Sequence, residues 1–487
     1  MKIYFSGHNY KYAAEQILLS LFSGEKPEYP EGPPLGDRVY ISLSEGEKYY
    51  TAFCSLKLSG KEHIGRASVA KHKITDELSK DRCLQKIIRL SFYRAAIASG
   101  LPRPTWGALT GIRPAKLMSN LLEEGMSEAL AVSEFCREYD VSRDRALLCL
   151  YAARAGLACS DSLSPRDVCL YVGIPFCPTR CSYCSFVSQS VSKSMELIPP
   201  FLEALYSEIE ATAAVIKMLN LRPISLYLGG GTPTTLSANQ LHELCEKLYS
   251  AFDLGFLREF TVEAGRPDTI NAEKLRVLKA HGVTRVSINP QTMDDRILEA
   301  IGRRHTAEDI FRALDEAALV GGLEINMDLI AGLPLDTPDT FKKTLNSVLD
   351  IGPENITIHT LSLKKGSSIM LKGTVKPTAE QVSEMLDYAS ASLFSAAYEP
   401  YYLYRQKYMS GGFENIGWQR GNRENIYNIC IMEELCSIIS MGGGASTKLC
   451  AGNGRLERIF NPKYPAEYIS SIDKIIKSKE KIKETIW

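Results

Sequence analysis

The sequence predicts an α/β protein whose central part, residues 165–365, is a partial (β/α)6 barrel. Short apolar runs alternate there with helical segments, and such alternation forms βαβ units with a parallel sheet. A cysteine loop follows the first run and a glycine run follows the second, as expected of ligand loops at the carboxyl ends of barrel strands. Six units leave the barrel open on one side. The predicted strands are 168–174, 224–229, 259–264, 284–289, 324–330 and 355–361, and the predicted helices are 195–218, 237–250, 271–281, 293–320 (in two pieces) and 337–350.

Residues 1–164 are predicted to form an N-terminal α+β accessory domain. Strand-like alternation in 38–43 and 48–56 flanks a Ser-Glu-Gly-Glu turn, which indicates a β-hairpin. The segment 160–165 has the composition of a linker. Helical periodicity predicts helices at 76–99, 114–124, 127–139 and 142–157.

Residues 366–487 are predicted to form a C-terminal accessory domain that covers the substrate. It begins with a helix at 377–396 and contains a glycine run at 442–444. The chain ends in a basic amphipathic tail, and we expect the charges of 474–481 to lie on one solvated helix face.

The composition is that of a globular protein: 45% of the 487 residues are hydrophobic, 23% are charged, and the formal net charge is zero. Such a balance gives no basic field that would attract nucleic acid. No apolar run reaches the ~18 residues of a membrane-spanning helix, and the N-terminus is too polar for a signal peptide. Thirteen cysteines without such a signal indicate a reducing compartment, so we expect a cytoplasmic protein.

Three cysteines stand at short spacing in Cys177-Pro-Thr-Arg-Cys181-Ser-Tyr-Cys184. A cubane iron–sulfur cluster takes four thiolates, so three indicate a 4Fe-4S cluster with one iron open for another ligand. Zinc is the alternative, although structural zinc prefers four closed ligands and no fourth Cys or His follows at finger spacing. Three buried free cysteines are a further alternative, for which a loop rich in Pro, Ser and Thr is a poor place.

This cysteine loop, taken with the glycine run Gly229–Pro233, resembles the radical S-adenosylmethionine (SAM) enzymes, in which the open iron chelates the amino and carboxylate groups of SAM. The resemblance implies that the three cysteines bind the cluster and that Tyr183 lies against the SAM adenine. It also implies that backbone glycines approach the methionyl part of SAM, where a side chain would collide. The residues of this approach are Gly230, Gly231 and Thr232.

Polar residues at the ends of later strands extend the candidate site. Glu263 ends the third strand and could hold a ribose hydroxyl or an ammonium group, with a helix cap or surface salt bridge as the alternative. The amide of Gln291 can both donate and accept. Arg303 could bind a carboxylate through two hydrogen bonds, although a surface arginine is the commoner case. Asp328 interrupts an apolar strand, where an unpaired charge is costly.

A longer set of motifs resembles one branch of the radical SAM proteins, the oxygen-independent coproporphyrinogen III oxidases and their relatives. The motifs span about 170–335 and comprise Tyr171 six residues before Cys177, Ile-Pro-Phe-Cys, Gly-Gly-Gly-Thr-Pro, Val-Glu-Ala, Asn-Pro-Gln, Gly-Arg and Asp-Leu-Ile-Ala-Gly-Leu-Pro. The resemblance implies that Tyr171 lies near the SAM sulfonium and that Glu263 binds the first SAM, and we take these two as the candidate catalytic residues. It implies a second SAM site at Gly231, Thr232, Gln291, Arg303 and Asp328.

The two ends of the chain narrow the resemblance to the HemZ-type coproporphyrinogen dehydrogenases. The segments that carry it are 106–113 and 402–407. Phe186 stands where the well-studied oxidases carry a further Cys, which removes no iron ligand but puts full equivalence of activity in doubt. Heme chaperone relatives also have Phe there, but their His-Asn-x-x-Tyr-Trp motif has no counterpart because the last histidine is His359.

The implied activity is oxygen-independent oxidative decarboxylation of coproporphyrinogen III propionates to vinyl groups by a SAM-derived 5′-deoxyadenosyl radical, in heme biosynthesis. A flavodoxin- or ferredoxin-like protein is the implied electron donor. The four substrate carboxylates need cations, for which Arg266, Arg303, Arg405 and Lys407 are candidates; solvated strand-end charges are the alternative for the last two. Other functions stay open: another radical SAM reaction on a tetrapyrrole, such as methyl transfer that opens heme; a heme carrier without turnover; and a structural zinc protein.

Overall fold

The computed structural model describes residues 1–22, 24–32, 36–184, 189–190, 195–362, 376–405, 412–451 and 456–486. The chain forms two compact units, Met1–Leu150 with Tyr404–Glu414, and Tyr151–Leu403 with Asn415–Trp487. This grouping differs from the predicted three parts. Helix α5 (Arg143–Asp161) runs across the boundary at residue 150, and most of the C-terminal segment joins the sheet of the second unit.

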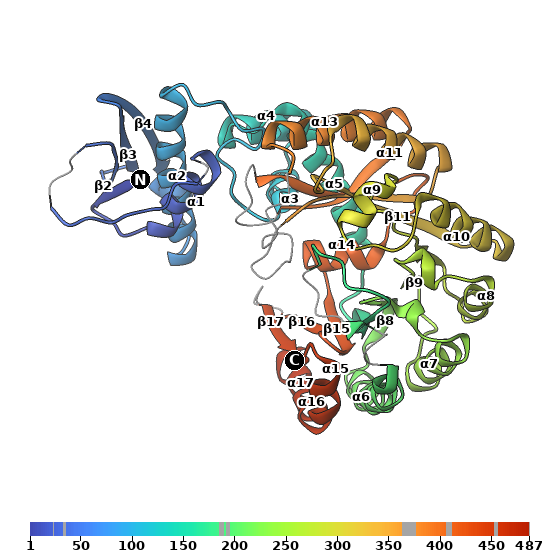
Figure 1. Ribbon diagram of the computed structural model, residues 1–487. Coiled ribbons are helices and arrows are strands. Elements are labelled where there is room, and N and C mark those ends of the chain that lie inside the picture. The colour runs from blue at the N-terminus through green and yellow to red at the C-terminus, as the bar shows by residue number, and fades with distance from the viewer. Residues whose placement is uncertain are drawn as a thin grey trace. The chain divides into compact units, whose positions relative to one another are not determined.

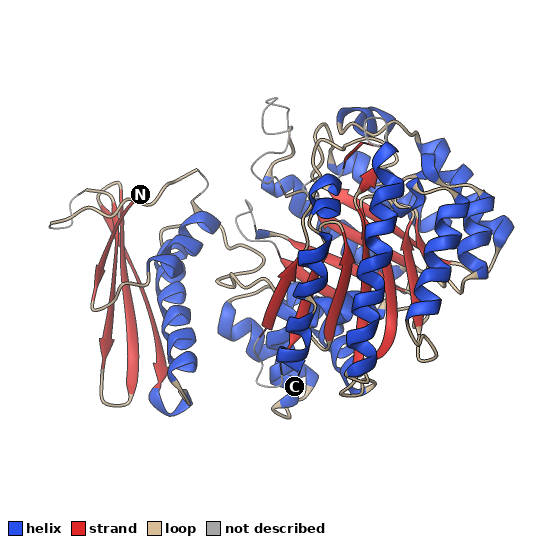
Figure 2. Ribbon diagram, turned by 90° about the horizontal axis from the view of Figure 1, so that it is seen from below, coloured by secondary structure: helices blue, strands red, loops and turns tan. Residues whose placement is uncertain are grey.

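The first unit contains a four-stranded sheet in the order β1-β2-β3-β4 (Figures 1 and 2). The predicted hairpin is confirmed, because β2 and β3 pair antiparallel, whereas β1, β4 and helix α1 were not predicted. Helix α2 packs closely on β4, and a Cβ at Gly65 would lie 2.0 Å from the carbonyl oxygen of Ser91. The elements are β1 (Lys2–Ser6), α1 (Lys11–Leu21), β2 (Arg38–Glu45), β3 (Tyr49–Leu58), β4 (Lys61–Ala70) and α2 (Glu77–Ala98).

The predicted helices of this unit are confirmed as α2, α3 (Pro114–Glu123), α4 (Glu128–Tyr139) and α5. Residues 106–113 and 402–407 are the two segments that carry the resemblance near the chain ends, and Trp106 and Arg405 bring them together. The guanidinium of Arg405 lies 4.7 Å from the ring centroid of Trp106. Arg405 donates to the carbonyl of Gly412 at 2.6 Å and to that of Leu109, and it is 8% exposed. The alternative of a solvated strand-end charge therefore does not hold for Arg405. Its bonds to main-chain carbonyls indicate a structural role rather than substrate binding.

Six parallel strands form the centre of the second unit, in the spatial order β12-β11-β10-β9-β8-β5. They confirm the predicted partial barrel, and the sheet does not close. The helices between them cover the outer side of the sheet (Figures 1 and 2). Side-chain caps such as the Ser237–Gln240 and Thr306–Asp309 capping boxes set where these helices begin. The strands are β5 (Asp167–Ile174), β8 (Arg222–Gly230), β9 (Glu259–Glu263), β10 (Arg285–Ser287), β11 (Glu324–Ala331) and β12 (Asn355–Thr360), and the helices are α6 (Ile198–Met218), α7 (Ala238–Ala251), α8 (Ala272–Ala280), α9 (Asp295–Ala300), α10 (Ala307–Val320) and α11 (Pro338–Ile351).

The C-terminal segment extends this sheet at both edges, which was not predicted. Strand β14 pairs antiparallel with β12, and β15 pairs parallel with β5. Edge strands expose unpaired backbone groups, so both edges of the open barrel gain partners from the same segment. Its elements are α13 (Ala379–Ser395), β13 (Glu399–Arg405), β14 (Glu414–Gln419), α14 (Ile426–Glu433), β15 (Ser437–Gly442), β16 (Ser446–Cys450), β17 (Leu456–Phe460), α15 (Pro465–Ser470), α16 (Ile472–Ser478) and α17 (Glu480–Ile486).

A buried ion pair fixes the C-terminal helices to helix α6. The Nζ of Lys479 lies 2.6 Å from Oε1 of Glu208, and both side chains are 1% exposed or less. Glu208 also accepts a hydrogen bond from the backbone N–H of Gly442 at 2.8 Å. The prediction that the charges of 474–481 lie on a solvated face is wrong for Lys479, which anchors the tail and the 442–444 glycine run.

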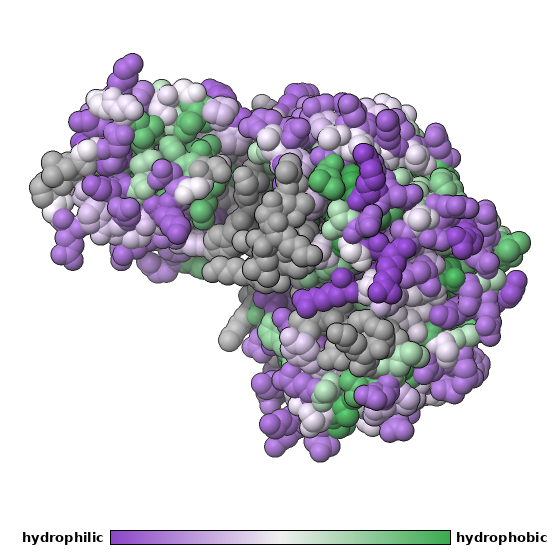
Figure 3. Space-filling view, in the orientation of Figure 1, coloured by the Kyte–Doolittle hydropathy of each residue, from purple (hydrophilic) through white to green (hydrophobic). Residues whose placement is uncertain are grey.

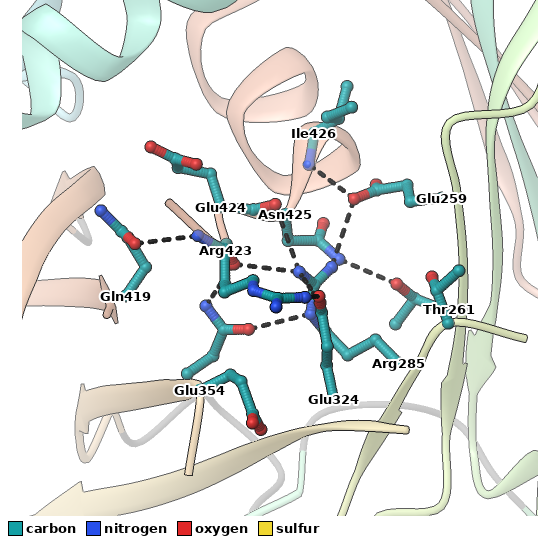
Figure 4. A network of polar contacts seen from close by, with 12 residues as sticks. Glu259, Thr261, Arg285, Glu324, Glu354, Gln419, Arg423, Glu424, Asn425 and Ile426 are labelled. Carbon is teal, nitrogen blue, oxygen red and sulfur yellow. Dashed lines mark hydrogen bonds and ion pairs between the residues drawn. The ribbon is translucent and has the colours of Figure 1, made fainter. Parts of the chain in front are cut away.

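A second buried network joins the amino ends of the central strands (Figure 4). Arg285, at the start of β10, contacts Glu259 of β9 at 3.2 Å and Glu324 of β11 at 2.6 Å. Its Nε donates to Oδ1 of Asn355 at 2.8 Å, and Glu259 accepts from the backbone N–H groups of Ile426 and Tyr427. One guanidinium thus ties four adjacent strands and the start of α14 together.

Among the residues described, no helix combines the length and the apolar character needed to cross a membrane. On the face shown in Figure 3, polar residues prevail and apolar ones are interspersed among them, as is usual for globular proteins.

The Arg285 network yields a stability prediction. Arg285→Met leaves the buried Glu259 without its cation, whereas Glu324 keeps its ion pair with Arg423. We therefore expect a loss of roughly 3–5 kcal/mol in the free energy of unfolding, measured by urea denaturation. Arg312→Met, which removes a surface ion pair with Asp309, is the control and should be nearly neutral. Equal losses in the two variants would contradict the role of Arg285.

Candidate functional site

The cysteine loop lies at the carboxyl end of β5. Cys177, Cys181 and Cys184 are each only partly buried, unlike the cysteines of the core. The loop folds back on itself through a hydrogen bond from the N–H of Cys184 to the carbonyl of Cys181 at 3.2 Å. Three partly buried cysteines on one compact loop suit a metal cluster better than a packed core.

Two buried arginines hold this loop. The Nη2 of Arg266 donates to the hydroxyl of Thr179 at 2.9 Å, and its Nη1 lies 3.8 Å from the sulfur of Cys181. The Nη1 of Arg303 donates to the carbonyl of Asn289 at 2.7 Å, and its Nη2 donates to the hydroxyl of Tyr183 at 3.3 Å. Because they are only 3% and 8% exposed, both cations act at short range on the loop.

The groups around Arg303 favour the protonated form of its guanidinium. Burial acts to lower the pKa of Arg303, but Tyr183 and Cys181 outweigh it and raise that pKa above its ordinary value. A positive charge beside a thiol favours the thiolate, which is the form that binds metal. The structure therefore places Arg303 beneath the loop rather than on the surface, and Arg266, a predicted substrate cation, is engaged by the same loop.

The glycine run is tied to the backbone of the cysteine strand. The N–H groups of Gly231 and Thr232 donate to the carbonyls of Ile174 and Phe176 at 2.8 and 2.7 Å. A Cβ at Gly231 would lie 2.4 Å from the Phe176 oxygen, so a side chain there would collide with the chain itself. The hydroxyl of Thr232 donates to the sulfur of Cys177 at 3.5 Å. Close approach of two backbones is thus one reason for the glycines, beside the predicted approach of a ligand.

Glu263 and a stack of tyrosines line the inside of the barrel. Oε1 of Glu263 accepts a hydrogen bond from Tyr227 at 2.8 Å. The ring of Tyr171 stacks on those of Tyr227 and Tyr427, with centroids 6.1 and 5.9 Å apart. Burial raises the pKa of Glu263 to about 7, against the opposing effect of the Tyr227 hydrogen bond and with help from the charge of Asp328. At neutral pH this carboxyl group is poised between its two protonation states.

Asp328 is the ionised carboxylate of the site. It accepts hydrogen bonds from Nδ2 of Asn289 at 2.8 Å and Nδ2 of Asn326 at 2.9 Å, and the Nε2 of His359 lies 3.8 Å away. Burial acts to raise the pKa of Asp328, but His359 and the hydrogen bonds of Asn326 outweigh it and hold that pKa below its ordinary value. The charge of Asp328 inside an apolar strand is therefore paired.

Gln291 lies in the segment after β10, where the backbone still pairs with β11. Its φ angle is 67°, in the left-handed region that few non-glycine residues adopt, and its backbone bonds both ways with β11, to Asp328 and Ile330. Such strain is common in functional sites. These backbone hydrogen bonds hold the buried Gln291 beside β11, the strand that carries Asp328.

The structure brings the predicted residues into one unit, along the carboxyl halves of the parallel strands and the loops that follow them. Sequence reasoning missed the tyrosine partners, Asn289 and His359, and gave Arg266 a different role. Asn289 is part of the Asn-Pro-Gln motif and Tyr227 lies in the predicted strand 224–229, whereas Tyr427 lies in α14 without any local signal. Two predictions, on Phe186 and Lys407, lie outside the described residues.

Comparisons with known proteins agree with this geometry. Residues 171–348 match the model of the radical SAM superfamily. The chain is 38% identical to the oxygen-independent coproporphyrinogen-III oxidase-like protein HemZ of Bacillus subtilis (strain 168) over 388 residues, 78% of this chain and 77% of that one. It is 35% identical over 222 residues to the heme chaperone HemW of the same strain, 45% of this chain and 57% of that one. The structure of coproporphyrinogen III oxidase (HemN) from Escherichia coli matches 66% of this chain and 72% of that one with a TM-score of 0.52 and 23% identity, which supports the fold.

The chain belongs to the radical SAM superfamily and, within it, to the family of oxygen-independent coproporphyrinogen-III oxidase-like proteins. The predicted family, fold and cofactors are thereby confirmed, since a 4Fe-4S cluster and SAM are what define the superfamily. The donor set fits these cofactors, because three partly buried cysteines lie beside two buried cations that favour an anionic cluster.

The Glu263 environment predicts opposite shifts from two substitutions. Tyr227→Phe removes a donor to the carboxylate and should raise the pKa of Glu263 further, whereas Asp328→Asn removes a negative charge and should lower it. Infrared difference spectroscopy, with the band identified by its loss in Glu263→Gln, measures both. Tyr249→Phe, a tyrosine bonded only to the backbone oxygen of His281 in the described contacts, is the control. Shifts of the same sign would contradict the assignment.

The raised pKa also has a stability consequence. The folded protein holds the Glu263 proton more tightly than an unfolded chain, whose ordinary value is 4.5. The stability that Glu263 contributes is therefore greatest at low pH and declines as the pH rises from about 4.5 to about 7.

Proposed function

We propose that this chain catalyses the oxygen-independent oxidative decarboxylation of coproporphyrinogen III propionates to vinyl groups, yielding protoporphyrinogen IX in heme biosynthesis. The observation that carries the proposal is the loop of three partly buried cysteines held by two buried arginines at the carboxyl end of the barrel. Similarity to HemZ over most of both chains supports the same reading.

In this proposal Cys177, Cys181 and Cys184 bind three irons of the cluster and leave the fourth iron to SAM. When bound, the reduced cluster and SAM supply a 5′-deoxyadenosyl radical that removes a hydrogen atom from the β-carbon of a propionate. The protein orients the reactants and excludes water and oxygen. Arg266 and Arg303 offset the negative charge that three thiolates bring to the loop.

The remaining candidate residues are assigned by their surroundings. We propose that Glu263 binds the first SAM and that Tyr171 lies near its sulfonium, as the family resemblance implies. Tyr183, fixed by Arg303, faces the adenine. The backbone of Gly230 and Gly231 borders the methionyl part. For a second SAM we assign Gly231, Thr232, Gln291, Arg303 and Asp328.

The stoichiometry of the proposed reaction requires an electron acceptor and an electron donor. Each propionate that becomes a vinyl group loses carbon dioxide, one hydrogen atom and one electron, so each turnover needs a one-electron acceptor. The cluster needs an electron as well, for which we propose a flavodoxin- or ferredoxin-like donor. No helix in the described part of the chain is suited to cross a membrane.

A heme carrier without turnover is the second candidate, because HemW proteins are among the relatives. That similarity covers 57% of the B. subtilis HemW chain. The His-Asn-x-x-Tyr-Trp motif of the chaperones has no counterpart after His359. The sequence therefore favours the oxidase reading.

Product analysis separates these functions. The anaerobically reconstituted protein is incubated with SAM, a strong reductant and coproporphyrinogen III, and products are read by mass. We expect two successive losses of formic-acid mass with 5′-deoxyadenosine formed alongside. Deoxyadenosine with a methylated or opened tetrapyrrole would indicate the other radical SAM reaction. Stoichiometric heme binding without deoxyadenosine would indicate the carrier.

A cysteine pair tests the cluster assignment. Cys181→Ala should lower 5′-deoxyadenosine formation by at least about 1,000-fold, because the loop then offers only two thiolates. Cys245→Ala, a buried cysteine of helix α7, should keep nearly full formation. An active Cys181→Ala enzyme would contradict the assignment of the iron ligands.

A further inference from the structure

Four buried cysteines converge at the other end of the barrel. The sulfur atoms of Cys169, Cys430 and Cys436 all lie within 4.8 Å of one another, and those of Cys169 and Cys436 are 3.7 Å apart. Cys159, in the last turn of α5, is a neighbour of Cys430 but lies outside that group of three. The four side chains are 8% exposed or less. They come from α5, β5, α14 and the residue before β15, which lie far apart in the sequence.

This cluster is separate from the candidate active site. Cys169 is the third residue of β5, whereas Cys177 follows the carboxyl end of that strand. At ~3.3 Å per residue, the eight-residue interval spans most of the depth of the sheet. The four cysteines therefore lie near the amino ends of the strands, on the side of the Arg285 network.

The spacing of the sulfurs selects the kind of ligand. Tetrahedral zinc with bonds of ~2.3 Å holds its sulfur ligands about 3.8 Å apart, close to the 3.7 Å between Cys169 and Cys436. A cubane, which binds one thiolate at each iron corner, spreads its ligands more widely. We propose that Cys159, Cys169, Cys430 and Cys436 form a structural zinc site that is independent of the proposed activity.

The surroundings are consistent with a buried thiolate centre. The acidic neighbours are already paired: Asp167 lies 2.6 Å from Arg222, and Glu259 lies 3.2 Å from Arg285. Each thiol that binds exchanges its proton, which leaves to solvent, for a zinc–sulfur bond, so no oxidant or reductant is needed.

Ordinary core packing of cysteine looks different in this chain. Cys54 and Cys245 are also buried, and in both the burial raises the pKa of the thiol without any contribution from another cysteine. Among the residues described, Cys169, Cys430 and Cys436 are the only three cysteines whose sulfur atoms all lie within 4.8 Å of one another. The proposed metal would tie the last turn of α5 and helix α14 to the edge where β15 joins β5.

The test uses the full chain with Cys177, Cys181 and Cys184 all replaced by alanine, which removes the loop thiols. Purified without oxygen from zinc-containing medium, this protein should hold one zinc per chain by mass spectrometry of the metal. X-ray absorption at the zinc edge should give a shell of about four sulfurs at ~2.3 Å. Folded protein without zinc would overturn the proposal. So would zinc bound by nitrogen and oxygen, as the exposed group His242, Glu246 and His281 would bind it.

Matched variants locate the site. In the same background Cys430→Ser should reduce bound zinc at least tenfold, whereas Cys245→Ser should leave it unchanged. Circular dichroism checks that both are folded. If Cys430→Ser does not fold, the absorption spectrum of the parent protein decides alone. Full zinc retention in a folded Cys430→Ser protein would overturn the assignment.

Discussion

Two buried guanidinium groups, those of Arg266 and Arg303, hold the cysteine loop against the carboxyl ends of the barrel strands. A buried cation needs partners. Arg266 finds them in the carboxylate of Asp268, the oxygens of Thr179 and the sulfur of Cys181. Arg303 finds them in the carbonyls of Gly265 and Asn289 and the hydroxyl of Tyr183. The loop in turn gains positive charge where thiolates must gather. The positions of Tyr183, the glycine run and the neighbouring strand ends all depend on this contact, because each is bonded to the loop or to Arg303.

The rest of the barrel supports the contact of Arg266 and Arg303 with the cysteine loop. Arg285 ties the amino ends of four strands, and the C-terminal segment gives each edge strand a partner. Stability is thus concentrated at the amino end and along the edges, while the carboxyl ends carry polar and strained residues such as Asp328 and Gln291. This division is usual for barrels whose chemistry lies at the carboxyl ends of strands.

The six central strands could be predicted because each is a short, largely apolar run that alternates with a helical segment. The C-terminal strands were missed because their pairing with β5 and β12 depends on residues far apart in the sequence. The motif residues of the site were found, but their contacts were not. Arg405 and Lys479 show the reason: a charged residue near a strand end or in a basic tail reads as solvated until a distant carbonyl or carboxylate is known to meet it.

The most direct test of this account is the reduction potential of the reconstituted cluster in two variants of the loop's surroundings. Arg266→Gln removes a buried charge beside Cys181, which should disfavour the more negative reduced cluster and lower the potential by on the order of 100 mV. Arg180→Gln removes an exposed charge of the same loop, which water and salt screen, and should change the potential little. Equal potentials in Arg266→Gln and the unaltered protein, with the cluster intact in both, would contradict the central role of the buried arginines.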